Sequence, residues 1–161
     1  MLLLASTSDL LRVVTSSAAT TDVHASFVDV NGSTVTPGRT NTLISTATTT
    51  TVVGSPGAST YRTVKTLTIR NRHASTAQDV TVLHSDGTNI PELIKATLSA
   101  GDALHYDEHA GFTVRDLLGR IKSRSDGLAS AAINSLNTVV LASDVINNNA
   151  TLNTIQDVTG L

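Results

Sequence analysis

Hydrophobic and polar residues alternate along residues 60–121 with the two-residue period of β-strands. The pattern predicts five strands, at 61–70, 79–84, 90–98, 103–106 and 111–115. The first has one face with Lys65, Leu67 and Ile69 and another with Val64, Thr66 and Thr68. In the next two strands the residues predicted to line up on one face are Val80 and Val82, then Ile94, Ala96 and Leu98.

Turn signals separate these strands at short intervals. Ser85-Asp-Gly87 and Ser99-Ala-Gly-Asp102 contain residues that favour tight turns, and the charged loop Asp107-Glu-His109 joins the last two strands. Pro91 places the third strand at a sheet edge or delays its start. Short strands with hairpin-like connections predict an all-β fold, an antiparallel β-sandwich or jelly roll.

The first part of the chain continues the strand pattern. Residues 1–4 form a short apolar run, predicted as a first strand or an N-terminal arm. Residues 10–14 suit either a capped helical turn or a strand, and the β-branched pair Val13-Val14 favours the strand. In 23–30 the two faces are Val23, Ala25 and Phe27 against His24, Ser26, Val28 and Val30. Asn31-Gly32 is a strong hairpin signal, so we predict a returning strand at 34–36 that ends at Pro37-Gly38. One or two further strands are expected in 43–53, before a break at 54–57.

The sequence changes character after Ile121. Residues 122–127 are small, charged and turn-prone, which is typical of a linker. Residues 128–161 are rich in Asn, Ala, Ser and Thr and have too few apolar residues to enclose a core alone. We therefore predict a β module at 1–121 and a C-terminal oligomerisation or projection segment at 128–161 that packs against sister chains. Both helical and extended conformations suit parts of that segment.

Composition argues against several classes of function. The net charge is −2, whereas nucleic-acid binding proteins present a clustered basic face. Aromatic residues make up only 2% of the chain, too few for a surface that stacks bases or sugars. The apolar start is too short for a signal core or a membrane span. We expect neither a nucleic-acid nor a membrane partner, and the absence of cysteine excludes disulfides and thiolate metal sites.

One cluster of residues could carry chemistry. If extended, His105, Asp107 and His109 would project on one side, an arrangement that could bind a divalent metal. A solvated hairpin tip is the favoured interpretation, because no other segment supplies an obvious further ligand. His24, His73 and His84 are scattered, and each is expected at a surface or edge position. We predict no catalytic, cofactor-binding or metal-binding residues, no cofactor, and no enzymatic activity.

Several phrases of the sequence resemble structural proteins of tailed bacteriophages. In the β module these are Leu3-Leu-Ala-Ser-Thr-Ser-Asp9, Val23-His24, Val35-Thr-Pro-Gly-Arg-Thr-Asn41, Tyr61-Arg-Thr-Val-Lys-Thr-Leu67, Ile69-Arg-Asn71, and the region from Asp86-Gly-Thr88 to Leu98-Ser-Ala-Gly101. Near the end they are Asn147-Asn-Asn-Ala, Asn153-Thr-Ile and Asp157-Val-Thr-Gly160, which resemble a segment preceding a β-rich tip in fibre-like proteins. The resemblance implies a homotrimer with a β-sandwich or jelly roll, attached to the virion surface.

The resemblance and the strand pattern lead to one favoured hypothesis and two alternatives. The first is a trimeric capsid decoration (cement) or head-fibre protein, assembled in the host cytoplasm, that binds the major capsid protein on the capsid exterior. The second is a tail-fibre or baseplate adaptor that contacts tail proteins and carries a host-recognition tip. The least favoured is a metal-dependent enzyme centred on His105 and His109.

Overall fold

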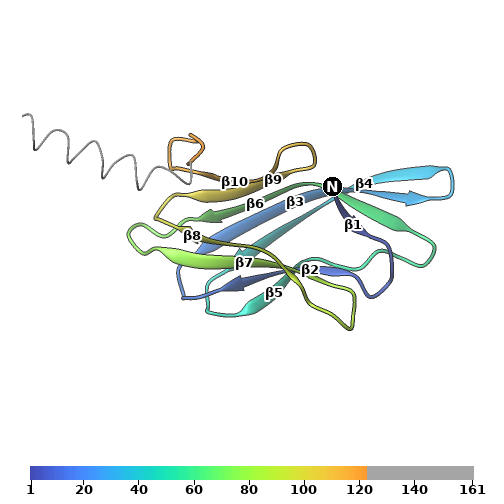
Figure 1. Ribbon diagram of the computed structural model, residues 1–161, viewed down its shortest axis with the longest axis horizontal. Coiled ribbons are helices and arrows are strands. Elements are labelled where there is room, and N and C mark those ends of the chain that lie inside the picture. The colour runs from blue at the N-terminus through green and yellow to red at the C-terminus, as the bar shows by residue number, and fades with distance from the viewer. Residues whose placement is uncertain (123–161) are drawn as a thin grey trace, which may run out of the picture. The chain divides into compact units, whose positions relative to one another are not determined.

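A computed structural model describes residues 1–122, which fold entirely into β-strands and turns (Figure 1). No helix occurs among these residues, so none of their elements could cross a membrane as a helix. The strands are β1 (Leu2–Leu4), β2 (Leu10–Thr15), β3 (Thr21–Asn31), β4 (Thr34–Ile44), β5 (Thr49–Val53), β6 (Tyr61–Asn71), β7 (Gln78–Ser85), β8 (Glu92–Leu98), β9 (Ala103–Asp107) and β10 (Gly111–Arg115).

The strands form two antiparallel sheets that face each other. The larger sheet has the order β10-β9-β6-β3-β4, and β1 pairs with the start of β6. The smaller sheet has the order β5-β2-β7-β8 and lies below the larger one in Figure 1. All neighbouring strands are antiparallel. The predicted all-β antiparallel sandwich is therefore confirmed, and β8, which follows Pro91, lies at a sheet edge as predicted.

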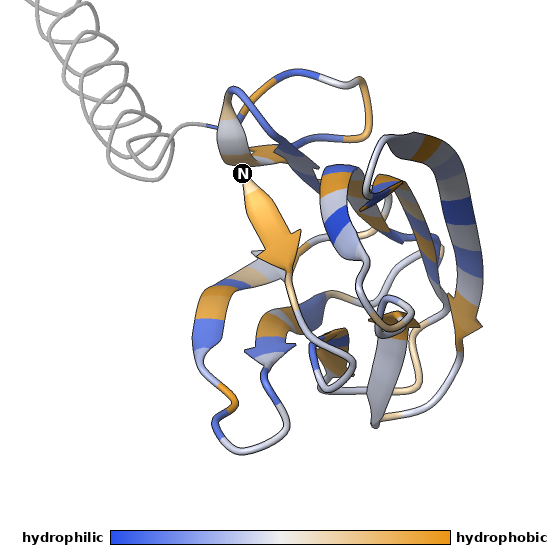
Figure 2. Ribbon diagram, turned by 90° about the vertical axis from the view of Figure 1, so that its right-hand side faces the viewer, coloured by the Kyte–Doolittle hydropathy of each residue, from blue (hydrophilic) through white to orange (hydrophobic). Residues whose placement is uncertain are grey.

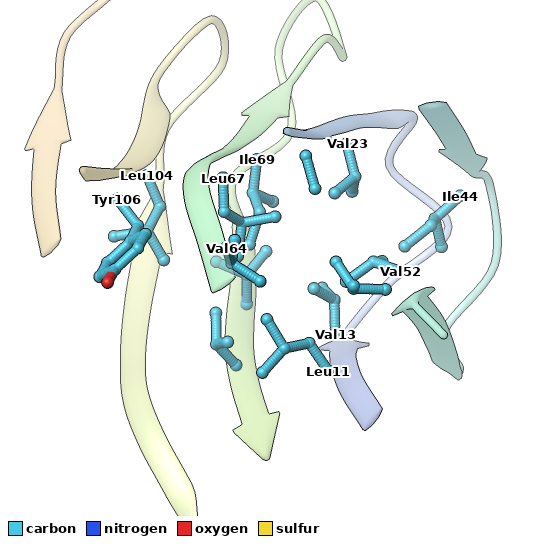
Figure 3. Packing of buried hydrophobic residues seen from close by; sticks show 14 of the residues in the cluster. Leu11, Val13, Val23, Ile44, Val52, Val64, Leu67, Ile69, Leu104 and Tyr106 are labelled. Carbon is cyan, nitrogen blue, oxygen red and sulfur yellow. The ribbon is translucent and has the colours of Figure 1, made fainter. Parts of the chain in front are cut away.

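Aliphatic side chains from both sheets fill the space between them (Figure 3). The alternating hydrophobic and polar bands along the strands in Figure 2 reflect this division into inner and outer faces. The core residues with no exposed surface are Leu4, Leu11, Val13, Ala25, Val53, Val64, Leu67, Ile69, Val80, Val82 and Leu98. Their separation in sequence means that the core forms only when both sheets are assembled.

The strand after the first hairpin is longer than predicted. We expected it to end at Pro37-Gly38, but β4 continues from Thr34 to Ile44. Pro37 is tolerated because β4 lies at the edge of the larger sheet. Gly38 pairs with Phe27, whose ring covers it so closely that a β-carbon at Gly38 would overlap the ring. The aromatic ring thus occupies the space that a side chain would fill, and the glycine is part of the strand.

A β-bulge reverses the predicted faces at the start of β6. The register between β3 and β6 shifts so that Ser26 pairs with Thr66 and Phe27 with Val64, which leaves Lys65 without a partner. Val64 is consequently buried in the core, whereas Lys65 is half exposed and forms an ion pair of 2.7 Å with Glu108. The predictions that Val64 shares a face with Thr66 and that Lys65 shares one with Leu67 are both wrong.

Two buried amides connect segments that are distant in sequence. Asn71 lies at the end of β6, and its Nδ2 donates to the carbonyl oxygens of Thr76, Leu98 and Ser99. Gln78 begins β7, and its Nε2 donates to the hydroxyl of Thr21 at 2.7 Å and to the carbonyl of Ala19 at 3.2 Å. Both side chains are at most 1% exposed, so these hydrogen bonds are shielded from water and hold the ends of the two sheets together.

The turn between β1 and β2 is organised by Asp9. Its carboxylate accepts hydrogen bonds from the backbone N–H groups of Ala5 and Ser6 and from the Ser6 hydroxyl. Burial raises the pKa of Asp9, but these bonds, with a smaller contribution from the nearby His84, outweigh it and lower the pKa below its usual value. Because the folded state favours the ionised carboxylate, Asp9 stabilises the fold above the pKa of an unfolded aspartate, about 3.9.

We expect Asp9→Asn to lower the free energy of unfolding at pH 7 by about 1–3 kcal/mol, because the amide oxygen replaces only part of the accepting capacity. As the pH falls through the lowered pKa of Asp9, wild type loses this stabilisation and the variant does not. Urea unfolding at pH 7, 4 and 2.5 should therefore show the two proteins converging in acid. Glu92→Gln, on an exposed edge strand, is the control, and a constant difference at all three pH values would contradict the assignment.

The predicted linker beyond Lys122 and the segment 128–161 lie outside the described residues. Their boundaries remain predictions.

Candidate functional site

The cluster predicted as a possible metal site is divided between a strand and a turn. His105 and Asp107 are in β9, and His109 is in the turn that follows, with 86% of its side chain exposed. The Nδ1 of His105 is 3.0 Å from the hydroxyl of Thr68. The carboxylate of Asp107 accepts hydrogen bonds from the backbone N–H groups of His109 and Ala110, which lower its pKa. These carboxylate contacts stabilise the hairpin tip, and the predicted tip is confirmed.

Within residues 1–122, no three His, Asp or Glu side chains are grouped closely enough to hold a metal ion. The Thr68–His105 pair is a hydroxyl next to an imidazole, as in hydrolases, but no carboxylate among the described residues is bonded to this imidazole to orient it. The Thr68–His105 pair therefore lacks the third, orienting group of a hydrolase triad among the described residues.

The other histidines have separate roles. His24 is exposed on β3, and its Nδ1 lies 2.7 Å from the Oδ1 of Asn41. His73 follows β6, and its ring nitrogen accepts from two backbone N–H groups of the same turn. His24 lies at the surface, as predicted, and His73 is half buried in its turn. His84 is also half buried, in β7, and its Nε2 is shielded from solvent without a hydrogen-bond partner in residues 1–122.

The outer face of the larger sheet carries the strongest candidate for a functional surface. Across its middle, register partners on five strands form a row of polar side chains. From edge to edge the row is Asn41, His24, Thr68, His105 and Thr113. Hydrogen bonds link Asn41 to His24 and Thr68 to His105, so the row has a defined geometry. An open depression of about 470 Å³ lies over its β3–β4 end.

One end of the same face is apolar. Val30 pairs with Tyr61 on one side and Val35 on the other, and in the next row Val28 pairs with Thr63 and Pro37. Leu3 of β1 continues this second row as the partner of Thr63. We call this surface the apolar platform and define it as Leu3, Val28, Val30, Val35, Pro37 and Tyr61.

The platform exposes large hydrophobic side chains to solvent. Val35 is 63% exposed, Tyr61 57% and Leu3 39%. Tyr61 is the one exposed aromatic residue of the chain, since Phe27 and Tyr106 are buried and Phe112 is half buried against Tyr106. Thr63 lies between Leu3 and Val28 in the second row, and the platform positions around it are apolar. Exposed hydrophobic side chains gathered at one end of a sheet are typical of a surface that binds another protein.

A polar cluster on the inner side of β3 and β6 holds the platform strands in place. Arg62 donates to both carboxylate oxygens of Asp29 at 2.7 Å, and it also donates to the carbonyl of Gly54 at 2.9 Å. Its guanidinium carbon lies 3.9 Å from the centre of the Phe27 ring. This cluster gives the outer apolar surface a rigid backing.

The alternating sequence pattern did not identify the platform as a surface. It placed Val28 and Val30 on the same side as His24 and Ser26, which is correct. Along that outer side the residues change from polar His24 and Ser26 to apolar Val28 and Val30, and this change was the one local indication of the platform. The contributions of Leu3 and Tyr61 require the pairing of β1 and β6 with β3, which no local pattern reveals.

No protein-family model, curated protein or solved structure matches this chain.

Proposed function

We propose that this chain is a structural protein of a tailed-bacteriophage virion. In this proposal it is a homotrimeric capsid decoration (cement) or head-fibre protein that binds the major capsid protein through the apolar platform. The resemblance in sequence supports the virion assignment. The apolar platform supports a docking role, because it is an exposed hydrophobic surface on a rigid sheet. Docking needs no catalytic group.

The platform is the observation that carries the proposal. Tyrosine is enriched among the residues that contribute most to protein–protein binding, and Tyr61 stands at the edge of an aliphatic surface. The capsid protein would cover this end of the sheet. The polar row that includes His24 and His105 would form the hydrated part of the same interface.

The size of the face agrees with that of a stable interface. Strands β3, β4 and β6 have 11 residues and span about 36 Å, β9 and β10 have five residues and span about 17 Å, and neighbouring strands lie about 4.8 Å apart. The outer face of the larger sheet therefore covers on the order of 700 Å². Each partner in a standard protein–protein interface contributes about 800 Å². A single copy could bind through this face alone, and three linked copies would bind with avidity.

Trimer formation is proposed for residues 128–161. Their apolar residues are too few to enclose a core in one copy, so association of three copies provides the missing partner surface. Light scattering of the purified protein should give three times the 16.7 kDa mass of one chain. Mass spectrometry of heads and tails separated from purified virions should find the chain with the heads. Its presence with the tails alone would favour the adaptor alternative, and its absence from both would reject the virion assignment.

We expect Val35→Lys combined with Tyr61→Lys to weaken binding to expanded capsids by roughly 100-fold or more. Both side chains are exposed in the free protein, so the change should leave the fold intact while placing two charges in the interface. Sedimentation of the protein with purified capsids measures the binding.

Thr49→Lys combined with Thr51→Lys is the matched control. Both threonines are exposed on β5 and, as partners of Val14 and Arg12, belong to the outer face of the smaller sheet. This control adds the same charge away from the platform and should bind like wild type. Equal binding by all three proteins would show that the platform is not the docking surface.

A further inference from the structure

Two arginines flank a small residue at the end of the outer face that lies away from the apolar platform. Arg70 of β6 and Arg115 of β10 are both register partners of Ala103 in β9. Register partners leave a sheet on the same side, so all three side chains lie on the outer face. Adjacent strands are about 4.8 Å apart, which places the two arginine Cα atoms about 10 Å apart. Ala103 contributes only a methyl group to the space between them.

The neighbouring cations each have a carboxylate, and these two arginines do not. The surrounding ion pairs are Arg72 with Asp22 at 3.3 Å, Lys122 with Asp102 at 2.6 Å and Arg120 with Asp116 at 2.7 Å. Within residues 1–122, no carboxylate lies within 4.0 Å of the guanidinium of Arg70 or Arg115. Two arginines that share one register partner therefore have no ion pair among residues 1–122, in a chain with a net charge of −2.

The two guanidinium groups differ in a way that suits a ligand. The Nε of Arg115 is buried and has no hydrogen-bond acceptor among residues 1–122, so this group has lost part of its hydration. Arg70 is exposed and lines the depression over β3, β4 and β6. An anion would thus meet one arginine that is already partly desolvated and another that can adjust. Ion pairs are stronger where water is excluded, and a planar guanidinium matches the oxygens of carboxylate and phosphate groups.

We propose that Arg70 and Arg115 form a binding site for an oxyanion, a carboxylate or phosphate group held above Ala103. The site does not depend on the proposed virion function, because small anions can test it on the purified protein alone. A ligand that carries such a group would place it between the two arginines and extend over the depression beside His24 and Thr68.

The test is a titration of the full-length, ¹⁵N-labelled protein with sodium phosphate and, separately, sodium acetate, at an ionic strength kept constant with sodium chloride. The backbone amide signals of Ala103 and its neighbours should shift and saturate, with a dissociation constant in the millimolar range. Arg70→Gln and Arg115→Gln should each weaken binding about tenfold or more, because each removes one guanidinium group, with its positive charge and its paired N–H donors. Tighter binding of phosphate than of acetate would identify a phosphate-bearing ligand, and the reverse a carboxylate-bearing one.

Arg39→Gln is the matched control. Arg39 is exposed on β4, is the partner of Ser26 on the same outer face, and also has no carboxylate within 4.0 Å among residues 1–122. Its replacement should leave the dissociation constant unchanged. Arg70→Lys keeps the charge and loses the paired donors, so it should weaken binding severalfold without unfolding the protein. Shifts that never saturate, or an equal loss in Arg39→Gln, would overturn the proposal.

Discussion

Replacing Asn71 by alanine is expected to lower the free energy of unfolding by about 3–5 kcal/mol. The side chain is fully buried, its Nδ2 donates to the carbonyls of Thr76, Leu98 and Ser99, and its Oδ1 accepts from the backbone N–H of His73. Alanine removes these bonds and leaves buried polar groups unpaired, each of which costs about 1–3 kcal/mol. The turns that follow β6 and β8 would loosen together, since the amide of Asn71 bonds to both.

Urea unfolding followed by circular dichroism measures this effect. Asn41→Ala is the control, because Asn41 is exposed on the outer face and its bond to His24 competes with water. We expect the control to cost less than about 1 kcal/mol. A loss for Asn71→Ala as small as that of the control would show that the buried amide does not connect the two turns.

Local pattern was sufficient to predict much of the fold. Val80 and Val82, and likewise Val23 and Ala25, alternate with polar residues, and each pair shares one face as predicted, which the structure buries. The pattern succeeds here because the pairing of each of these stretches is regular, so each side chain keeps its face. Turn chemistry succeeded for a similar reason, since Gly87 and Gly101, among others, adopt the positive φ that a turn requires.

Pattern failed where a distant segment determines the local structure. The strand through Gly38 continues because Phe27 covers the glycine, and the two residues meet only when the hairpin has formed. The burial of Asn71 and Gln78 depends on partners more than 25 residues away, such as Leu98 and Thr21. A polar residue in a sequence gives no indication of such partners, so burial of an amide looks unfavourable until the contacts are known.

The candidate surface was predictable only in part. The outward direction of Val28 and Val30 followed from alternation within β3. The combination with Leu3, and the two uncompensated arginines at the other end, depend on strand order and register. A face assembled from several strands is therefore a property of the sheet, and single-strand patterns show only portions of it.

The bulge in β6 leads to the second large effect. Val64→Lys is expected to lower the free energy of unfolding by more than about 4 kcal/mol, because the bulge turns this position into the core beside Phe27 and the ammonium would be buried without a partner. Thr66→Lys should cost only about 1 kcal/mol, since Thr66 is on the outer face and loses one hydrogen bond to Ser26. Unbroken alternation places Val64 and Thr66 on one face and predicts similar costs for both changes. Thermal unfolding of the two variants thus distinguishes the bulged register from the regular one, and equal destabilisation would contradict the bulge.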